Sequence, residues 1–352
     1  MGASAAARAG TLRLAVAGCG TLFERYYLPA LARSNVWNLV GACDPSAARR
    51  QWLQHAWRGL VVCERLSQLL EVRNLDALFI LTPPDTHYRL GLEALDAGLH
   101  VLVEKPMALN AADAQRILEA SRRAGRQLWV GFTRRFRAPY QALKTLLGDG
   151  LVREIAALRC HMCFTPVAWG AVTGYLGDES KGGGVLHDVA SHQVDLLAWL
   201  LGQPIEAVRV REGSAASRVT YDLRFVNGLV AQCVAEHGQS YREHLEVALP
   251  GRTVAAHAAG VLQSRHLPAA WAEHYGRVLT RLDGIARRVS GRPNVTSESF
   301  AMQCAAFAAA LRGGNPFPRG ADARDGAASV RAIDACSRAL PNPGTWVPLL
   351  PE

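Results

Sequence analysis

In the first 130 residues, short apolar runs alternate with segments bounded by residues typical of helix starts and ends. This alternation restricts the fold more than any other feature. Strands that alternate with helices are joined by crossover connections and so lie parallel in one sheet. Two of the helices have readable ends, since Thr86 is expected to cap one that Gly98 ends, and Asn110 another that Gly125 ends. The expected strands are residues 12–17, 36–43, 60–62, 77–81, 101–104 and 128–131. The pattern predicts an α/β domain with a doubly wound parallel sheet.

The second half of the chain has a different pattern, in which apolar and polar residues alternate with a period of two. Residues 219–225 and 229–235 both alternate, and Asn227-Gly228 between them supplies the positive φ angles of a type I′ turn, which predicts a hairpin. Further period-two runs occupy residues 155–163, 205–211 and 244–249, and helical patterns occupy residues 267–289, 300–311 and 326–339. These runs predict a largely antiparallel sheet with one apolar face. We therefore expect a flexible tail of residues 1–10, a parallel-sheet domain of residues 11–135 and an α+β domain of residues 136–352.

Composition places the chain among folded globular proteins. Its 352 residues are 49% hydrophobic and 20% charged, and the length predicts two domains. It contains no apolar run of about 18 residues, as a membrane span requires, and its start lacks an apolar signal core, so we expect no membrane partner and a cytoplasmic location. The eight cysteines are scattered, and Cys160 and Cys163 have no second pair to complete a zinc site. Reduced, mostly buried thiols are predicted.

The net charge of +9 favours an anionic ligand. The arginines are spread along the chain instead of forming one basic stripe, so we do not expect a nucleic-acid partner. The densest basic run, residues 277–292, is interpreted as the solvated face of a helix.

The first predicted strand runs into Gly18-Cys19-Gly20-Thr21-Leu22-Phe23. The two glycines permit a tight turn and the close approach of a pyrophosphate to the helix that follows. Phe23 occupies the place of a third glycine, so the helix must lie further from the strand or the loop must differ. The next strand ends at Asp44, whose carboxylate can bind the ribose hydroxyls and repel a 2′-phosphate. Together these features predict an NAD site, and the alternative is that Asp44 only caps the next helix.

Two further strand ends carry residues suited to a ligand site. Thr82-Pro83-Pro84-Asp85-Thr86-His87 follows the fourth strand at the carboxyl edge of the sheet, where such folds bind ligands. Glu104-Lys105-Pro106 ends the fifth strand, and the proline holds Lys105 out of the α region, so its side chain is expected to point into the cleft. From this tripeptide alone, a surface lysine is an equal alternative.

A second motif begins with the glycine triplet Gly182-Gly183-Gly184. Asp188, His192 and Asp195 follow at spacings i, i+4 and i+7, so they are expected to share one helix face. An imidazole beside a carboxylate forms an acid/base pair, and the triplet lets the backbone pass close to nicotinamide and substrate. The alternatives are a packed His192, or a metal held by His187, Asp188 and His192.

These motifs occur in the order seen in the glucose–fructose oxidoreductase, inositol dehydrogenase and rhizopine catabolism family, which the chain resembles over nearly its whole length. The resemblance implies a Rossmann domain followed by a domain with an open-faced sheet. We expect no metal, because the spacing of His187, Asp188 and His192 fits the acid/base motif equally well. The resemblance also implies a catalytic set of Lys105, Asp188 and His192. In that set His192 takes the proton from a substrate hydroxyl as hydride leaves for nicotinamide, Lys105 holds the reacting oxygen, and Asp188 binds the substrate.

The same resemblance extends to the binding residues. Gly131-Phe132-Thr133-Arg134-Arg135-Phe136 is similar to a substrate-facing stretch of the family in which asparagine is frequent at the place of Thr133, so Arg134 is the expected contact. The expected substrate-binding residues are Arg134, Trp169, Tyr175, His187 and Asp188, with the two aromatic residues forming a wall against a sugar ring or serving a structural role. The expected cofactor-binding residues are Gly18, Gly20, Thr21, Leu22, Phe23, Asp44, Thr82, Pro83, Pro84, His87, Glu104 and Lys105.

The resemblance predicts an NAD-dependent oxidoreductase acting on a secondary alcohol or carbonyl of a sugar, cyclitol or sugar derivative. NADP is the alternative cofactor because Arg49 and Arg50 follow Asp44, and Lys181 suits an acidic or nucleotide-linked substrate. The competing functions are an enzyme that recycles bound NAD during glycoside cleavage or epimerisation, and a redox-silent regulator. An uncovered apolar sheet face predicts a homodimer or homotetramer packed through the second domain, unless residues 267–289 cover it.

Overall fold

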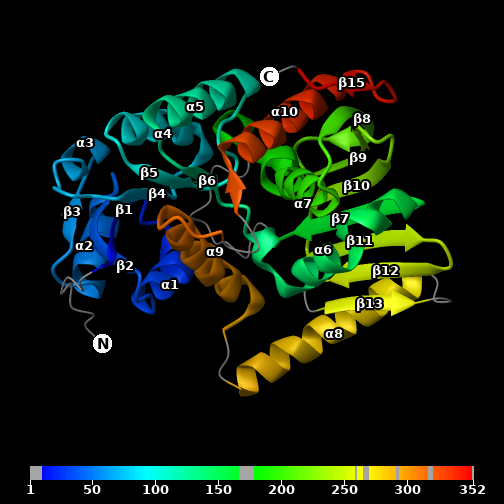
Figure 1. Cartoon of the computed structure of the whole chain (residues 1–352), viewed down its shortest axis with the longest axis horizontal. Helices are drawn as coiled ribbons and strands as arrows, with labels where there is room; N and C mark the ends of the chain where they lie inside the picture. The colour runs from blue at the N-terminus through cyan, green and yellow to red at the C-terminus, as the bar shows by residue number, and fades with distance from the viewer. Residues whose placement is uncertain are drawn as a thin grey trace. The chain divides into compact units, whose positions relative to one another are not determined.

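The computed structural model describes residues 10–165, 178–257, 260–264, 269–290, 293–315 and 320–350. The chain divides into two compact units, one of residues up to 131 together with 300–327, and one of residues 132–299 together with those from 328 onward (Figure 1). Residues 1–9 of the expected tail (residues 1–10), and the expected substrate contacts Trp169 and Tyr175, lie outside the described residues.

The first unit is built on a seven-stranded sheet with the order β14-β6-β5-β4-β1-β2-β3. Its strands are β1 (Leu12–Ala17), β2 (Trp37–Cys43), β3 (Val61–Cys63), β4 (Ala77–Ile80), β5 (His100–Val103), β6 (Leu128–Val130) and β14 (Ala321–Asp322). Strands β1 to β6 pair in parallel, which confirms the doubly wound sheet, and the short β14 pairs antiparallel to β6. The strand order reverses between β1 and β4, and at such a point the connections diverge and leave space for a ligand at the carboxyl edge.

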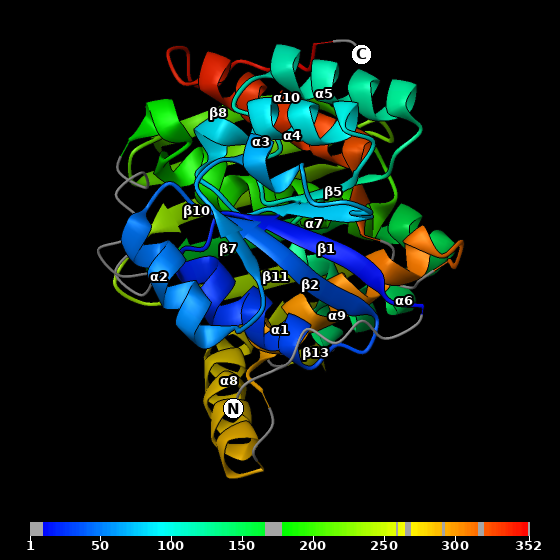
Figure 2. The ribbon, with the colours of Figure 1, turned by 90° about the vertical axis from the view of Figure 1, so that its left-hand side faces the viewer.

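Helices cover both faces of this sheet, and Figure 2 shows α4 and α5 on one face and α1 on the other. The helical segments are η1 (Phe23–Tyr27), α1 (Leu28–Ala32), α2 (Ala47–Ala56), α3 (Leu66–Leu69), η2 (Pro84–Thr86), α4 (His87–Asp96) and α5 (Ala111–Ala124). The predicted ends of α5 are confirmed, because Asn110 Oδ1 accepts from the amide of Asp113 at 2.9 Å and Gly125 has a φ of 61°. The predicted cap at Thr86 is wrong. Thr86 has helical backbone angles where a cap needs an extended residue, and its hydroxyl donates to the carbonyl of Pro83.

A late helix completes the core of the first unit. Helix α9 (Val295–Leu311) begins five residues before the expected residue 300, and its part from Phe300 onward belongs to this unit. The ring of Phe307 lies 5.2 Å from that of Trp129 and 6.0 Å from that of Trp37. The indole Nε1 of Trp37 also donates to the carbonyl of Cys304 at 2.8 Å. These contacts bury an aromatic cluster against one face of the sheet.

The second unit is built on an eight-stranded sheet with the order β13-β12-β11-β7-β10-β9-β8-β15. Its strands are β7 (Ala157–Phe164), β8 (Ile205–Ser214), β9 (Arg218–Phe225), β10 (Val230–His237), β11 (Arg242–Leu249), β12 (Arg252–His257), β13 (Gly260–Ser264) and β15 (Val347–Pro348). All neighbours pair antiparallel except β7 and β10, which are parallel. The predicted, largely antiparallel sheet is therefore confirmed.

The hairpin of β9 and β10 is also confirmed, but its predicted turn type is wrong. A type I′ turn needs two residues with positive φ, and here Gly228 has a φ of 85° while Asn227 does not have a positive φ. The amide of Phe225 donates to the carbonyl of Leu229, and the amide of Gly228 donates to the carbonyl of Phe225. The loop therefore has three residues between the paired ends, and a single left-handed glycine closes it.

The two faces of this second sheet differ in chemistry. The helical segments are η3 (Thr133–Phe136), α6 (Ala138–Leu151), η4 (Val152–Glu154), η7 (Glu179–Lys181), η8 (Leu186–Ala190), α7 (Ser191–Leu201), α8 (Ala269–Val289) and α10 (Ala323–Ala339). Apolar residues of α6, α7 and the later part of α10 pack on the inward face. The outward positions include Arg159, His161, Gln232, His244 and Glu246, and α8 contacts the strands β11 to β13. These outward positions are polar, so the expectation of an uncovered apolar sheet face is wrong for them. The homodimer or homotetramer stays a prediction, but an apolar sheet face no longer supports it.

Composition led to two further expectations, one about the cysteines and one about membrane-spanning helices. All eight cysteines are free thiols, and seven of them are buried. Among the residues that the structure describes, no helix combines the length and the apolar character that crossing a membrane requires.

Candidate active site

The turn after β1 is tightly bent at Gly18 and open beside Gly20. Gly18 has a φ of 94°, and a Cβ atom there would lie 2.8 Å from the backbone of Leu81 and Thr82 at the end of β4, so only glycine fits. A Cβ atom on Gly20 would meet no atom within 4 Å, which leaves open space beside the turn. Burial and the nearby Asp44 carboxylate raise the pKa of the Cys19 thiol to about 12, so this thiol stays neutral. The turn thus fits a pyrophosphate.

The helix after this turn adapts to Phe23 by a change in its own winding. Thr21 and Leu22 form the start of the helix, and Phe23 begins the π-helical segment η1. The side chain of Phe23 is fully buried, and its carbonyl accepts from the amide of Leu28, five residues later. The wider π turn accommodates a large side chain where the usual fingerprint has glycine.

Asp44 ties the end of β2 to the glycine turn. Its Oδ2 atom accepts from the amide of Cys19 at 2.7 Å, and its Oδ1 atom accepts from the amide of Ser46 at 2.9 Å. Because a carboxylate offers about four acceptor positions, further positions remain for ribose hydroxyls. Helix α2 is capped by Ser46 instead, whose hydroxyl accepts from the amide of Arg49.

The side chains of Arg49 and Arg50, on α2, donate to backbone carbonyls near the glycine turn and the end of β2. Arg49 donates through Nε to the carbonyl of Cys19 at 2.6 Å and forms an ion pair with Glu24 at 2.9 Å. Arg50 donates to the carbonyls of Asp44 and Pro45 at 2.9 and 2.8 Å. Both guanidinium groups therefore brace the polypeptide around the turn.

The end of β5 is organised around the buried carboxylate of Glu104. Tyr27 donates its hydroxyl to Glu104 Oε1 at 2.6 Å, and the amide of Lys105 donates to Oε2 at 3.2 Å. Burial and the Glu104 carboxylate raise the pKa of Tyr27 well above 10, which keeps it a donor. A Cβ atom on Gly131 would lie 2.8 Å from the same carboxylate. Glu104 is therefore held on three sides at the base of Lys105.

His87 links the turn that follows β4 to the turn that follows β5. Its ring is fully buried, with Nδ1 2.8 Å from the carbonyl oxygen of Pro106 and Nε2 2.8 Å from that of Thr82. Burial lowers the pKa of His87. Pro84 is buried and Pro83 is exposed beside them. The ring of His87 contacts the polypeptide through both nitrogens, so its place is that of a support for the Lys105-Pro106 turn.

In the second unit, the expected acid/base residues lie where η8 continues into α7. Gly182 and Gly184 have φ angles of 83° and 80°, and the chain then winds as a π-helical turn that carries the half-buried His187 and Asp188. The Oδ2 atom of Asp188 lies 3.0 Å from Nε2 of His237 on β10. This partner of Asp188 was not among the residues predicted from the sequence.

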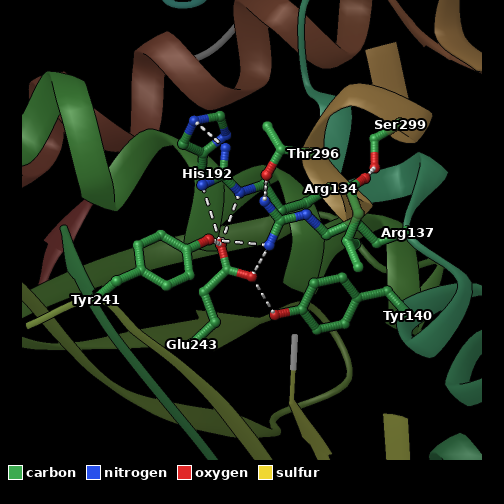
Figure 3. Close-up of polar contacts among 9 residues, drawn as sticks. Arg134, Arg137, Tyr140, His192, Tyr241, Glu243, Thr296 and Ser299 are labelled. Atoms are coloured by element: carbon green, nitrogen blue, oxygen red, sulfur yellow. Dashed lines mark hydrogen bonds and ion pairs between the residues drawn. The ribbon is translucent and has the colours of Figure 1, made fainter. Parts of the chain in front are cut away.

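His192 lies in the first turn of α7 and contacts Arg134, as Figure 3 shows. The distance from its Nε2 atom to Nη1 of Arg134 is 2.9 Å. Because a guanidinium group only donates, Nε2 is the acceptor, and the proton of the neutral ring is on Nδ1. Arg134 also lies 4.7 Å from the ring centre of Phe164 and donates through Nε to Glu243 at 3.0 Å.

Glu243 is the centre of this cluster (Figure 3), although it was not among the residues predicted from the sequence. Its buried carboxylate accepts from Arg134, Arg137, Tyr241 and Tyr140. Burial alone would raise the pKa of Glu243, but the two guanidinium groups outweigh burial and lower it. The signal was present in β11, where Glu243 is in phase with the inward residues Leu245, Val247 and Leu249.

The remaining expected residues have separate partners. Asp195, expected on the face of Asp188 and His192, accepts from Arg135 at 3.0 and 2.6 Å in a buried, bidentate contact that joins η3 to α7. Lys181 forms an exposed ion pair with Asp178 at 3.3 Å.

Two protein-family models match this chain, one in each unit. Residues 12–132 match the oxidoreductase family with an NAD-binding Rossmann fold, and residues 140–254 match the GFO/IDH/MocA C-terminal domain. Relatives include D-glucoside 3-dehydrogenase of Escherichia coli, 30% identical over 55% of each chain, and inositol 2-dehydrogenase of Streptomyces avermitilis, 33% identical over 53% of each chain. The match thus spans about half the length of these relatives.

The fold of the whole chain is similar to that of a solved structure. This is the WlbA dehydrogenase from Bordetella pertussis in complex with NADH and UDP-GlcNAcA, with a TM-score of 0.81 and 23% identity over 99% of this chain and 100% of that one. With a Rossmann domain and a C-terminal domain that both match, the chain belongs to the Gfo/Idh/MocA family of oxidoreductases.

Proposed function

We propose that the protein is an NAD-dependent dehydrogenase that oxidises a secondary alcohol of a sugar or cyclitol derivative, or reduces the corresponding carbonyl. The observation that carries this proposal is the lone pair on Nε2 of the buried His192, which accepts from Arg134 and lies one helical turn after Asp188. A general base must present a lone pair to the proton it takes. In the proposed reaction the substrate hydroxyl takes the place of the Arg134 N–H at this atom.

The proposed oxidation divides the alcohol into a proton and a hydride. The hydroxyl proton passes to Nε2 of His192 while the hydrogen on the same carbon leaves as hydride, and bound NAD supplies the acceptor for that hydride. Lys105 is proposed to hold the reacting oxygen and to stabilise its developing negative charge. Glu104 supports this role because it fixes the backbone of Lys105 at the carboxyl end of β5. In the reverse direction, protonated His192 returns its proton to the alkoxide.

The proposed substrate class rests on the relatives. One relative acts on a D-glucoside and another on inositol, and the similar solved structure was in complex with UDP-GlcNAcA. These compounds share a six-membered ring with several secondary hydroxyl groups. Arg134, His187 and Asp188 are the residues we propose to contact such a ring.

A spectrophotometric screen tests the function directly. The protein is incubated with NAD and with inositols, glucosides and nucleotide sugars in turn, and the absorbance band of reduced nicotinamide is followed. We expect NADH to accumulate with at least one ring polyol. Conversion of a glycoside without accumulation of NADH would favour recycling of bound cofactor, and no conversion of any ring compound would favour a redox-silent role.

The cofactor preference is expected to follow from Asp44. A 2′-phosphate would face its carboxylate, and like charges brought together cost several kcal/mol, so we expect NADP to bind at least about tenfold more weakly than NAD. Asp44→Ala should narrow this difference to about threefold, as measured by titration of each dinucleotide. The matched control is Asp76→Ala, because Asp76 also accepts from a backbone amide, that of Arg13 at 2.6 Å, but precedes β4 at the opposite edge of the sheet. Tighter binding of NADP by the wild type would contradict the assignment.

A further inference from the structure

His237 is held at the end of β10 by backbone contacts on both sides. Its amide donates to the carbonyl of Ser217 at 2.7 Å, and the amide of the next residue, Gly238, donates to the carbonyl of Phe164 at 2.9 Å. Along β10, His237 is in phase with the buried residues Cys233 and Ala235. Its side chain therefore belongs to the inward face of the sheet, where η8 and α7 pack.

The contact between His237 and Asp188 is largely shielded from solvent. The side chains are 9% and 14% exposed, and Nε2 of His237 lies 3.0 Å from Oδ2 of Asp188. A carboxylate only accepts hydrogen bonds, so Nε2 of His237 carries the proton in this contact. The carboxylate is consequently bonded to a donor from β10, a strand paired with β7 and β9 on its two sides, although it is itself carried by a short π-helical turn.

The two imidazoles near the start of α7 thus have opposite partners. His192 faces the cation Arg134 and presents a lone pair at Nε2, whereas His237 faces the anion Asp188 and presents an N–H at Nε2. The first arrangement suits a proton acceptor, and the second suits a group that orients a neighbour. This difference separates the roles of the two histidines.

We propose that His237 is a positioning residue that fixes the carboxylate of Asp188 in the orientation in which it binds substrate hydroxyls. This inference rests on the proposed function, because it takes Asp188 as a substrate contact. A carboxylate held in its productive orientation before binding does not have to be ordered when substrate arrives. Loss of His237 should therefore weaken substrate binding more than it slows the chemical step.

The tautomer of His237 gives a test that needs no substrate. Long-range 1H–15N spectra distinguish a ring nitrogen that carries hydrogen from one that does not, and the His237 signals are assigned by their loss in His237→Gln. We expect a protonated Nε2 in the wild type, and loss of this preference in Asp188→Ala. A hydrogen-free Nε2 in the wild type would overturn the proposal, whatever the protein oxidises.

Kinetics with the ring compound oxidised in the screen gives the second test. We expect His237→Ala to raise KM about tenfold with kcat within about threefold, since small displacements of a binding group are costly. In His237→Gln the side-chain amide can donate to the same carboxylate, so KM should return to within about threefold of the wild type. A fall in kcat with unchanged KM, or no rescue by glutamine, would overturn the proposal.

His161→Gln is the matched control, because His161 contacts Glu236 at 3.3 Å on the outward face of the same sheet. We expect it to leave KM and kcat unchanged. If the wild type oxidises no ring compound, the proposed function fails, and the tautomer measurement still decides whether His237 holds Asp188.

Discussion

Replacement of Lys105 or His192 by alanine is expected to lower turnover by about two orders of magnitude or more, while the affinity for NAD stays within a few fold. His192→Ala removes the atom proposed to take the proton, and Lys105→Ala removes the positive charge proposed to stabilise the reacting oxygen. Each loss is on the scale measured for general bases and oxyanion donors. Turnover is measured at saturating NAD with the compound found in the screen, and NAD affinity by titration.

The controls separate chemistry from binding. Asp44→Ala should weaken NAD binding with a smaller effect on turnover at saturating cofactor, which is the opposite pattern. Lys144→Ala removes a lysine that donates to the carbonyl of Leu200, at the other end of α7 from His192, and should leave turnover unchanged. Near-normal turnover in both Lys105→Ala and His192→Ala would show that the family roles do not apply to these residues.

Glu243→Gln is expected to lower the free energy of unfolding by about 3 to 5 kcal/mol. Arg134 and Arg137 then lose their shared counter-charge although their side chains are only 11% and 3% exposed, and such broken buried pairs cost about this much. Urea unfolding followed by circular dichroism measures the change. Glu206→Gln is the matched control, because Glu206 pairs with Arg224 at 2.9 Å with both side chains partly exposed. It should change stability by about 0.5 kcal/mol or less.

The contribution of Glu243 should also depend on pH with a definite sign. Its pKa is lowered in the folded protein, because Arg137 and Arg134 outweigh the opposite effect of burial. The stabilisation is therefore complete above the unfolded-state pKa, about 4.3, and is lost as the pH falls through the lower folded-state pKa. The difference in stability between the wild type and Glu243→Gln should narrow as the pH is lowered below about 4. A difference that stays constant down to acid unfolding would contradict this account.

The sequence was most informative where structure depends on neighbours along the chain. The six parallel strands were predictable because each is a short apolar run between helix signals, and Asn110 and Gly125 mark the ends of α5 by local hydrogen bonding and backbone angle. Lys105 and Asp44 were predictable as strand-end residues for the same reason. The turn between β9 and β10 shows the limit of such signals. Asn-Gly correctly indicated a hairpin, but the number of loop residues depends on how the strands pair.

Contacts between distant segments were not predictable from local patterns. Asp188 and His237 are 49 residues apart, and the late helix α9 packs on strands near the start of the chain. Glu243 was the nearest to a detectable signal, since a charge in phase with apolar residues must have a buried partner. The identity of that partner depends on the fold, because Arg134 and Arg137 reach it from η3 and the start of α6.

Residues 300–327 belong to the first unit but are synthesised after residues 132–299 of the second unit. A ribosome releases the chain from its amino end, so strands β1 to β6 emerge while helix α9, whose Phe307 packs on Trp37 and Phe79, has not yet been translated. The second sheet, from β7 to β13, emerges in the interval. During translation, the aromatic side chains of the first unit therefore stay uncovered until α9 (Val295–Leu311), near the end of the chain, has been synthesised.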